Sequence, residues 1–251
     1  MSKTALITGA TSGIGKATAE LFAENGIDLI LCGRRQDRLD QLKKELKEKV
    51  NVHTLSFDVR DKEAVFTKID SLPEEFKVID ILVNNAGNAH GLSPIQDGDV
   101  DDWDAMIDIN VKGLLYVSKV IINQMKERKA GHIINIGSIA GKDVYPNGNV
   151  YNASKFAVNA LNEAMRYDLN EFGIRVGAVH PGLVNTEFSE VRFKGDKEKA
   201  ENVYKGYDPL YAEDIADIIY FMVSRKRHVN IADLVVYPTA QASATIVNKN
   251  I

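Results

Sequence analysis

Cysteine is almost absent from this sequence, with Cys32 the single thiol in 251 residues. One cysteine cannot form an internal disulfide, and its position in an apolar run indicates a buried thiol. The sequence also has no apolar stretch of the length that a membrane-spanning helix requires. No signal peptide is recognisable, because the chain passes from Met1 almost directly into a strand-like run. From these absences we expect a soluble cytoplasmic protein.

Strong charge of either sign is missing as well. The net charge is −4 and the isoelectric point is near 5.8, which gives no basic surface for nucleic acid or an anionic membrane. The hydrophobic share of 45% and the charged share of 26% are those of an ordinary globular protein. No metal site is predicted, because the histidines lack the spacing of metal ligands. They are His53, His90, His132, His180 and His228.

What the sequence does contain is a regular alternation of apolar runs and helical patterns. The apolar runs predict strands at residues 4–8, 29–32, 52–57, 79–83, 133–136, 175–179 and 234–237. The segments between them predict helices near 14–25, 37–46, 62–72, 102–126, 149–172 and 212–223, with Asp37 capping the second. Such alternation favours a parallel sheet with helices on both faces. We expect one domain over residues 1–251, because neither a linker nor a repeat divides the chain.

One long segment, residues 183–209, shows no clear helical or strand pattern. It contains Gly195, Gly206 and mixed charges. A loop of this length inside a compact domain is often a lid over a site, here a substrate lid. A surface excursion without that role explains the same composition, so both interpretations stay open.

A glycine-rich turn separates the first predicted strand from the first predicted helix. Glycines allow the backbone to turn tightly and approach a pyrophosphate, which the free N–H groups at a helix N-terminus can bind. The spacing is Gly-x-x-x-Gly-x-Gly and differs from the common Gly-x-Gly-x-x-Gly fingerprint. A turn without a ligand is the alternative, but the position between strand and helix favours a dinucleotide. The predicted contacts are Gly9, Thr11, Ser12, Gly13, Ile14 and Gly15.

Two arginines, Arg34 and Arg35, follow the second predicted strand. NAD sites usually have an acidic residue here for the ribose 2′-hydroxyl, whereas a guanidinium matches a phosphate in charge and geometry. The sequence therefore predicts NADP, with both arginines on its 2′-phosphate; two solvated arginines at a helix start are the alternative. Asp58 and Val59 follow the third strand, where they can reach the adenine, although Asp58 could equally cap a helix.

Tyr151 and Lys155 have the spacing of neighbours on one helix face. A nearby ammonium favours phenolate and lowers the pKa of a tyrosine, which then exchanges a proton near neutral pH. Ser138 precedes Tyr151 by thirteen residues, and Asn110 lies in the long predicted helix. Each has an ordinary explanation by itself, such as a chance pair on a solvated helix, a turn serine or an asparagine that bonds the backbone. Together they predict a set of side chains that handles a proton.

These motifs, in this order, resemble those of the short-chain dehydrogenase/reductase family. The resemblance extends over essentially the whole chain. It rests on Thr8-Gly-x-x-x-Gly-x-Gly15, Asn84-Asn85-Ala86-Gly87, Asn110, Ser138, Tyr151-x-x-x-Lys155 and Pro181-Gly182-x-Val184-x-Thr186. It implies a single-domain Rossmann fold, a homotetramer and an enzyme that acts on CH–OH groups. Segments 135–138, 186–193 and 238–243 look like the branch of NADP-dependent 3-hydroxy acid dehydrogenases, which are described as oxidising serine and allo-threonine.

The resemblance also implies a role for each matching residue. Tyr151 is the acid/base, Lys155 tunes its pKa and contacts the nicotinamide ribose, and Ser138 orients the substrate oxygen. Asn110 supports a water relay in this family. The implied cofactor contacts after the fourth and sixth strands are Asn85, Ala86, Gly87, Pro181, Gly182, Val184 and Thr186.

A hydroxy acid substrate needs a cation for its carboxylate. Arg192 and Lys194, in segment 183–209, are the candidates, although both could simply be solvated. The main hypothesis is NADP-dependent oxidation of 3-hydroxy acids such as L-serine or L-allo-threonine. The alternatives are a broad-specificity NADPH-dependent carbonyl reductase and a non-catalytic NADP-binding regulatory protein. The intact Ser138, Tyr151 and Lys155 argue against the regulator, which has no need of them.

Overall fold

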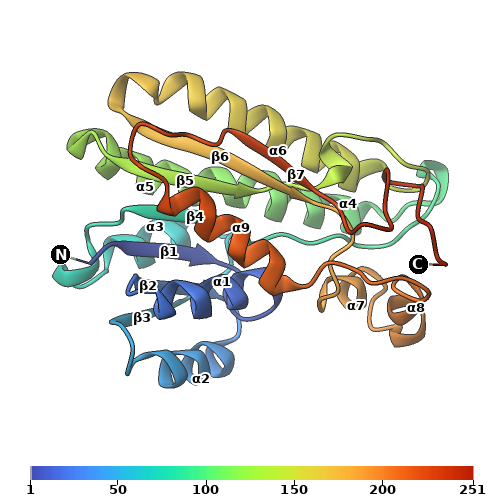
Figure 1. Ribbon diagram of the computed structural model, residues 1–251, viewed down its shortest axis with the longest axis horizontal. Coiled ribbons are helices and arrows are strands. Elements are labelled where there is room, and N and C mark those ends of the chain that lie inside the picture. The colour runs from blue at the N-terminus through green and yellow to red at the C-terminus, as the bar shows by residue number, and fades with distance from the viewer. Residues whose placement is uncertain (1, 251) are drawn as a thin grey trace.

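The computed structural model describes residues 2–250 and is built around one sheet (Figure 1). Within these residues the sheet has seven strands in the order β3-β2-β1-β4-β5-β6-β7. They are β1 (Thr4–Thr8), β2 (Asp28–Gly33), β3 (Val52–Ser56), β4 (Ile81–Asn84), β5 (Gly131–Ile136), β6 (Ile174–Pro181) and β7 (Asp233–Val236). Each pair of neighbouring strands is parallel. The predicted Rossmann fold with a doubly wound parallel sheet is therefore confirmed.

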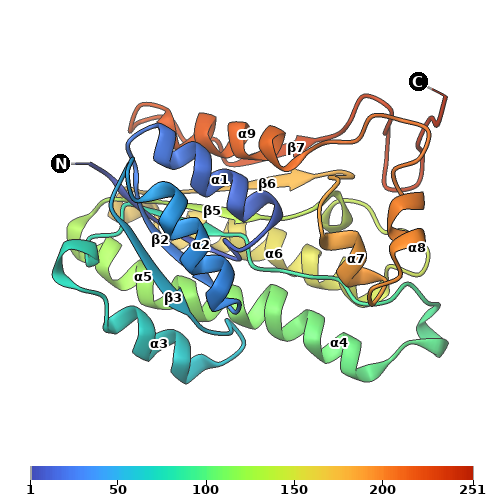
Figure 2. The ribbon, with the colours of Figure 1, turned by 90° about the horizontal axis from the view of Figure 1, so that it is seen from below.

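Helices cover both faces of the sheet (Figure 2). One face carries α1 (Gly13–Glu24), α2 (Gln36–Leu46) and α9 (Ala212–Ser224). The other carries α3 (Lys62–Asp70), α5 (Leu114–Arg128) and α6 (Asn149–Asp168). Successive residues of β1 point into different cores: Leu6 belongs to the core that contains Ile121 of α5, and Ile7 to the core that contains Phe22 of α1. Burial on both faces explains why the strands are continuous apolar runs.

The strand order reverses beside β1, which pairs with β2 on one side and with β4 on the other. The chain therefore leaves β1 toward one edge of the sheet and later returns to build the opposite half. Where the order reverses, the connections after the two adjacent strands diverge and leave a crevice at their carboxyl ends, where open α/β sheets bind ligands. The glycine turn and the segment after β4 both begin at this crevice.

The long helix predicted over residues 102–126 is divided into three segments. α4 (Val100–Ile107) and α5 are joined by a π-helical stretch, η3 (Asp108–Gly113). A π-helical turn takes one residue more than an α-helical turn and is frequent at functional sites. The apolar spacing could not reveal it, because one extra residue disturbs a helical pattern only slightly.

The roles of the aspartates near the starts of α2 and α3 were not all predicted correctly from the sequence. α2 begins at Gln36, so the prediction that Asp37 caps this helix is wrong and Asp37 lies inside the first turn. α3 is capped by Asp61, whose carboxylate accepts a backbone hydrogen bond at 3.0 Å. Asp58 is therefore not the cap, and its carboxylate accepts a hydrogen bond from Arg60 at 2.7 Å. Aspartate suits both a cap and a first turn, which explains the ambiguity.

Segment 183–209 is not irregular throughout, because it contains two short helices. They are α7 (Phe188–Arg192) and α8 (Lys197–Asn202), and Asp196 caps the second. Both lie beyond the carboxyl ends of the strands, to one side of the helix layers (Figures 1 and 2). Helices this short give no recognisable period in a sequence.

Short 3₁₀ turns complete several connections. They are η1 (Glu74–Phe76), η2 (Ile95–Asp97), η4 (Ile139–Gly141) and η5 (Asn170–Phe172), and the last one ends the predicted helix over residues 149–172. Cys32 is buried, as its apolar surroundings predicted. Over residues 2–250, no helix combines the length and the apolar character needed to cross a membrane.

Candidate active site

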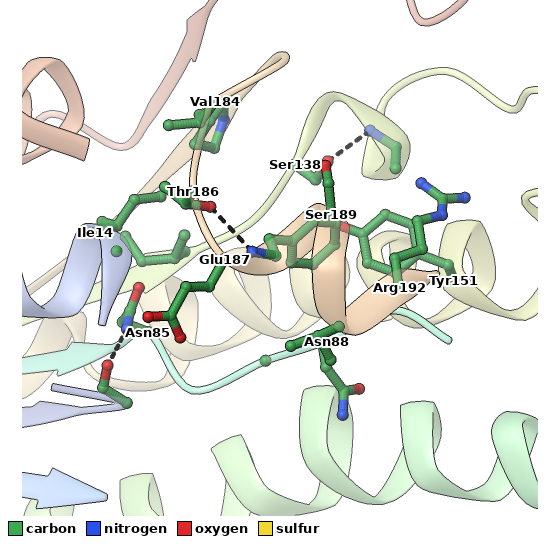
Figure 3. Close-up of a pocket in the computed structure, with 18 of the residues that line it drawn as sticks. Ile14, Asn85, Asn88, Ser138, Tyr151, Val184, Thr186, Glu187, Ser189 and Arg192 are labelled. Atoms are coloured by element: carbon green, nitrogen blue, oxygen red, sulfur yellow. Dashed lines mark hydrogen bonds between the residues drawn. The ribbon is translucent and has the colours of Figure 1, made fainter. Parts of the chain in front are cut away.

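A cavity of about 550 Å³ opens at the carboxyl ends of the strands (Figure 3). Its wall comes from the glycine turn, the ends of β2 and β3, the segments after β4, β5 and β6, and helices α6 and α7. Most residues predicted for the site lie on this wall, and Gly15 and Asn110 lie next to it. The wall residues are Gly9, Thr11, Ser12, Gly13, Ile14, Arg34, Arg35, Asp58, Val59, Asn85, Ala86, Gly87, Ser138, Tyr151, Lys155, Pro181, Gly182, Val184, Thr186 and Arg192.

The glycine turn brings three backbone segments together. Gly9 has a φ of +66°, a conformation that favours glycine. A Cβ on Gly15 would lie 2.4 Å from the Gly9 carbonyl oxygen and 2.5 Å from Nδ2 of Asn85. α1 can therefore start this close to β1 only with glycine at position 15. Its N-terminus reaches the cavity through Gly13 and Ile14, as a pyrophosphate site requires.

Thr8 joins the end of β1 to the segment after β4. Its Oγ1 accepts hydrogen bonds from the backbone N–H groups of Asn85 and Ala86, both at 3.0 Å. The Asn85 side chain returns a bond from Nδ2 to the Thr8 carbonyl oxygen at 2.9 Å. These bonds fix the floor of the crevice.

The two predicted arginines after β2 are held differently. Arg34 is exposed, with Nη1 3.8 Å from the Asp58 carboxylate. Arg35 donates from Nη2 to the hydroxyls of Thr11 and Ser12, each at 2.9 Å. Burial raises the pKa of Asp58, but hydrogen bonds from a neighbouring arginine more than offset this and keep the pKa below its usual value. This end of the cavity is cationic and suits a phosphate.

Asn110 braces the cavity from the π-helical stretch η3. Its Nδ2 donates to the Asn88 carbonyl oxygen at 2.8 Å, and its Oδ1 accepts from the Asn88 N–H at 2.9 Å. The same Nδ2 donates to Oγ of Ser154, on α6, at 3.0 Å. A Cβ on Gly87 would lie 2.9 Å from the Asn110 Oδ1, so this contact requires glycine. Asn110 thus joins η3, α6 and the segment after β4, and its part in a water relay stays a prediction.

Ser138, Tyr151 and Lys155 meet at one end of the cavity. Ser138 follows β5, and its Oγ accepts a hydrogen bond from the Ala140 N–H at 3.1 Å (Figure 3). Lys155 donates from Nζ to the Ile136 carbonyl oxygen at 3.0 Å, and this Nζ lies 5.9 Å from the centre of the Tyr151 ring. Tyr151 and Lys155 are each only 7% exposed.

Burial dominates the proton affinities of this pair. It raises the pKa of Tyr151 well above its usual value and lowers the pKa of Lys155 to about 8. A hydrogen bond with Ser138 and the charge of Arg192 act to lower the Tyr151 pKa, but burial outweighs them. The predicted net lowering of the Tyr151 pKa is therefore wrong for the protein's own groups, because burial outweighs the nearby cations and helical spacing contains no information on desolvation.

Arg192 brings a second cation to Tyr151. Its guanidinium carbon lies 5.5 Å from the centre of the Tyr151 ring, and the two side chains are adjacent in Figure 3. Nη2 donates to the Tyr145 hydroxyl at 3.0 Å, and Nε donates to the Gly91 carbonyl oxygen at 3.4 Å. These bonds hold the guanidinium beside Tyr151 at this end of the cavity.

Lys194 is engaged elsewhere. Its ammonium pairs with the carboxylates of Asp102 at 2.8 Å and Asp99 at 3.5 Å, on the side of α4. This corrects the suggestion that Lys194 supplies the cation for a substrate carboxylate. Of the two candidates, Arg192 faces the cavity.

The segment after β6 is positioned by the chain near the C-terminus. Oε1 of Gln241 accepts a hydrogen bond from the Leu183 N–H at 2.9 Å, and a Cβ on Gly182 would lie 2.3 Å from this oxygen. On the opposite side of the crevice, a Cβ on Gly13 would lie 3.3 Å from Cβ of Thr186. The segment therefore closes over the start of α1.

Several residues that line the cavity were not assigned to the site from the sequence, among them Tyr145, Glu187 and Gln241. Tertiary contacts bring Tyr145 to Arg192 and Gln241 to Leu183. Gln241 lies in segment 238–243, but nothing in that segment predicts its contact with Leu183, and no motif contains Tyr145. Glu187 had a local signal, because it directly follows Thr186 at the end of a predicted motif.

Together these features define a class of protein. The glycine turn and the cationic end fit a phosphorylated dinucleotide, and a buried tyrosine with a lysine and a serine suits proton transfer at the other end. This combination is that of a nicotinamide-dependent oxidoreductase. The chain belongs to the short chain dehydrogenase family, whose model matches residues 3–197. The predicted family is confirmed.

Several well-described proteins resemble the chain over nearly its whole length. Sulfoacetaldehyde reductase 2 of Chromohalobacter salexigens is 47% identical over 243 residues, which cover 96% of each chain. The NADP-dependent 3-hydroxy acid dehydrogenase of Schizosaccharomyces pombe is 44% identical over 245 residues, covering 96% of this chain and 95% of that one. The closed form of a serine dehydrogenase complexed with NADP⁺ has a TM-score of 0.92 and is 44% identical, and the match covers 96% of this chain and 97% of that one.

Proposed function

We propose that the protein is an NADP-dependent dehydrogenase that oxidises short 3-hydroxy acids such as L-serine or L-allo-threonine. The observation that carries this proposal is the place of Arg192, whose guanidinium carbon lies 5.5 Å from the Tyr151 ring in the same cavity. A guanidinium binds a carboxylate well, so Arg192 can hold the acid group while Tyr151 reaches the hydroxyl. The 3-hydroxy acid and serine dehydrogenases among the similar proteins support this substrate class.

In this proposal Tyr151 is the residue that transfers the proton. NADP⁺, when bound, accepts the hydride from the substrate carbon. Tyr151 as phenolate takes the hydroxyl proton, and Ser138 donates a hydrogen bond to the oxygen as it becomes a carbonyl. The charge of Lys155 counters the effect of burial on the phenolate. Positioned proton transfer of this kind contributes about 10²–10⁴-fold in rate.

The cofactor site in this proposal extends along the whole cavity. Gly9 and Gly15 let the turn pack closely against the segment after β4, and the N-terminus of α1 at Gly13 and Ile14 faces the cavity, where it binds the pyrophosphate. Arg34 and Arg35 bind the 2′-phosphate. The residues that contact the two ends of the cofactor are assigned by their position on the cavity wall. Asp58 and Val59 lie at the adenine end. The residues toward the nicotinamide end are Asn85, Ala86, Gly87, Pro181, Gly182, Val184 and Thr186.

The test is a panel of substrates, read by the absorbance of NADPH. Turnover of L-serine or L-allo-threonine with NADP supports the proposal. Turnover of uncharged ketones or aldehydes alone would indicate the broad-specificity carbonyl reductase. Binding of NADPH without turnover of any substrate would indicate the regulatory protein.

A second candidate reaction is the reduction of a short anionic aldehyde by NADPH. The same Arg192 favours it, because a guanidinium binds a sulfonate as well as a carboxylate. The similarity to a sulfoacetaldehyde reductase points to the same chemistry. Sulfoacetaldehyde therefore belongs in the panel, and a kcat/KM above those of the hydroxy acids would favour this reaction.

We also propose that segment 183–209 is a substrate lid and that the enzyme is a cytoplasmic homotetramer. The lid is supported by α7, which places Phe188 and Arg192 on the cavity wall. The exposed apolar side chains of Leu115 on α5 and Phe156 on α6 support an assembly through these helices. Sedimentation analysis measures the mass in solution, and a monomer at micromolar concentration would contradict the tetramer.

A further inference from the structure

The Glu187 carboxylate bridges two arginines at the cofactor end of the cavity. Glu187 follows Thr186 and precedes α7 (Figure 3). Its Oε2 accepts a hydrogen bond from Nη1 of Arg35 at 3.1 Å. Nη1 of Arg38 donates to Oε1 at 2.7 Å and to Oε2 at 3.0 Å. Burial raises the pKa of Glu187, but the two arginines more than offset this and keep the pKa below its usual value.

Arg35 is one of the two arginines assigned to the 2′-phosphate, yet its guanidinium already has partners on three sides. Nε and Nη2 donate to Oγ1 of Thr11 at 3.2 and 2.9 Å, and Nη2 also donates to Oγ of Ser12 at 2.9 Å. Nη1 carries the bond to Glu187. A phosphate that binds Nη1 must displace this carboxylate or lie beside a like charge, which is unfavourable. Glu187 therefore competes with the phosphate for Arg35.

Arg38 offers the displaced carboxylate a second partner. It lies on α2, one turn beyond Arg35, and contacts both oxygens of Glu187. Glu187 therefore needs to release only Arg35 to admit a phosphate. The bond to Arg38 can hold the carboxylate in place during this exchange.

Through α7, Glu187 is connected to the end of the cavity that contains Tyr151. The ring of the next residue, Phe188, lies 5.7 Å from the Tyr151 ring, measured between centres. The far end of α7 is anchored, because the Gly91 N–H donates to the Arg192 carbonyl oxygen at 2.9 Å. Glu187 therefore directly precedes the side chain that packs on Tyr151.

We propose that Glu187 and Arg38 form an anion-exchange pair that sets the preference for NADPH over NADH. The proposal rests on the proposed placement of the 2′-phosphate at Arg35. When the phosphate binds, Glu187 gives up Arg35 and pairs with Arg38 alone, which keeps α7 over the nicotinamide end. NADH carries no 2′-phosphate and leaves Glu187 on Arg35.

The test measures the Kd values of NADPH and NADH by titration calorimetry, which requires no turnover. Glu187→Gln keeps the size of the side chain and removes its charge. We expect the ratio of the NADH Kd to the NADPH Kd to rise about 3- to 5-fold, because only NADPH competes with the carboxylate. The matched control Glu24→Gln removes an exposed carboxylate 3.4 Å from Lys49 and leaves the ratio unchanged. A ratio unchanged in Glu187→Gln overturns the proposal.

Arg38→Gln separates exchange from a direct phosphate contact. In the wild-type background it removes the second partner of Glu187, so the ratio falls. In the Glu187→Gln background there is no carboxylate for Arg38 to pair with, so Arg38→Gln leaves the ratio of the two Kd values unchanged. An equal fall in both backgrounds means that Arg38 binds the phosphate directly, which overturns the exchange.

Arg35→Gln tests the placement of the phosphate on its own. We expect it to lower the ratio about tenfold, because a charge-assisted hydrogen bond to the phosphate is lost. If Arg35→Gln leaves the ratio unchanged, the phosphate lies elsewhere and both the site assignment and the exchange are overturned. If it lowers the ratio while Glu187→Gln has no effect, the exchange alone is overturned.

Discussion

A buried phenol is a poor acid, so the proposed proton transfer at Tyr151 depends on nearby charges that oppose the effect of burial. Burial raises its pKa, while a hydrogen bond with Ser138 and the charge of Arg192 act in the other direction. Lys155 lies 5.9 Å from the Tyr151 ring centre, and with a pKa of about 8 it is mostly protonated at neutral pH. In the proposed mechanism the phenolate therefore depends on several cations, namely Lys155, Arg192 and the oxidised nicotinamide when NADP⁺ is bound, rather than on Lys155 alone.

Tyr151→Phe removes the phenol and keeps the ring that packs against Phe188. We expect NADPH binding to persist and kcat to fall about 10²–10⁴-fold, because the substrate proton loses its positioned acceptor. Stopped-flow measurement of NADPH formation and a binding titration check the two parts. Tyr167→Phe, at an exposed tyrosine on the same helix, is the control. A kcat within about tenfold of the wild type would remove Tyr151 from the acid/base role.

Arg192→Ala removes the cation that we assign to the substrate carboxylate. We expect the KM for L-serine to rise about 10- to 100-fold with a smaller change in kcat, because a charge-assisted hydrogen bond is lost. An uncharged ketone, measured in parallel, should keep its KM. Arg225→Ala removes an exposed arginine at the end of α9 and is the control. An unchanged KM for L-serine in Arg192→Ala would exclude Arg192 from the substrate site.

At the scale of elements, the site depends on how closely backbone segments approach one another at the start of α1. A Cβ at position 15 would lie 2.4 Å from the Gly9 carbonyl oxygen. Gly15→Ala should therefore shift the turn, weaken NADPH binding and lower the free energy of unfolding by about 1–3 kcal/mol. Urea unfolding and an NADPH titration measure both effects. Lys16→Ala, at the next and exposed position of α1, should leave both near the wild type, and equal effects in the two variants would contradict the steric explanation.

Some elements of this fold can be predicted from the sequence and others cannot. The inner strands could be predicted because both of their faces are buried, and the glycine turn because its constraint is local. The helices of segment 183–209 were missed because α7 and α8 span less than two turns each. Two wall residues, Tyr145 and Glu187, join the site through bonds to arginines 47 and 152 residues away, and no local pattern contains such contacts. Burial at Tyr151 was likewise invisible, although it determines the sign of the pKa change.

At the scale of the whole molecule, burying both faces of the sheet also buries polar groups. His132 lies in β5 and is 2% exposed. Burial lowers its pKa to about 3 from the ordinary value of 6.5, because the charged imidazolium loses its hydration inside the protein. The folded protein therefore keeps His132 neutral over a pH range in which the unfolded chain protonates it. This difference ties the stability of the whole fold to pH.

Acid should destabilise the protein through His132. Below pH 6.5 the unfolded chain binds a proton that the folded state does not bind until about pH 3. The free energy of unfolding therefore falls as the pH falls, by up to about 1.4 kcal/mol per pH unit for this group. Urea unfolding at about pH 7 and about pH 5 measures the loss, and His132→Leu should make it smaller, whereas His228→Leu, at an exposed histidine, should not. An equal loss in His132→Leu and the wild type would show that other groups account for the acid sensitivity.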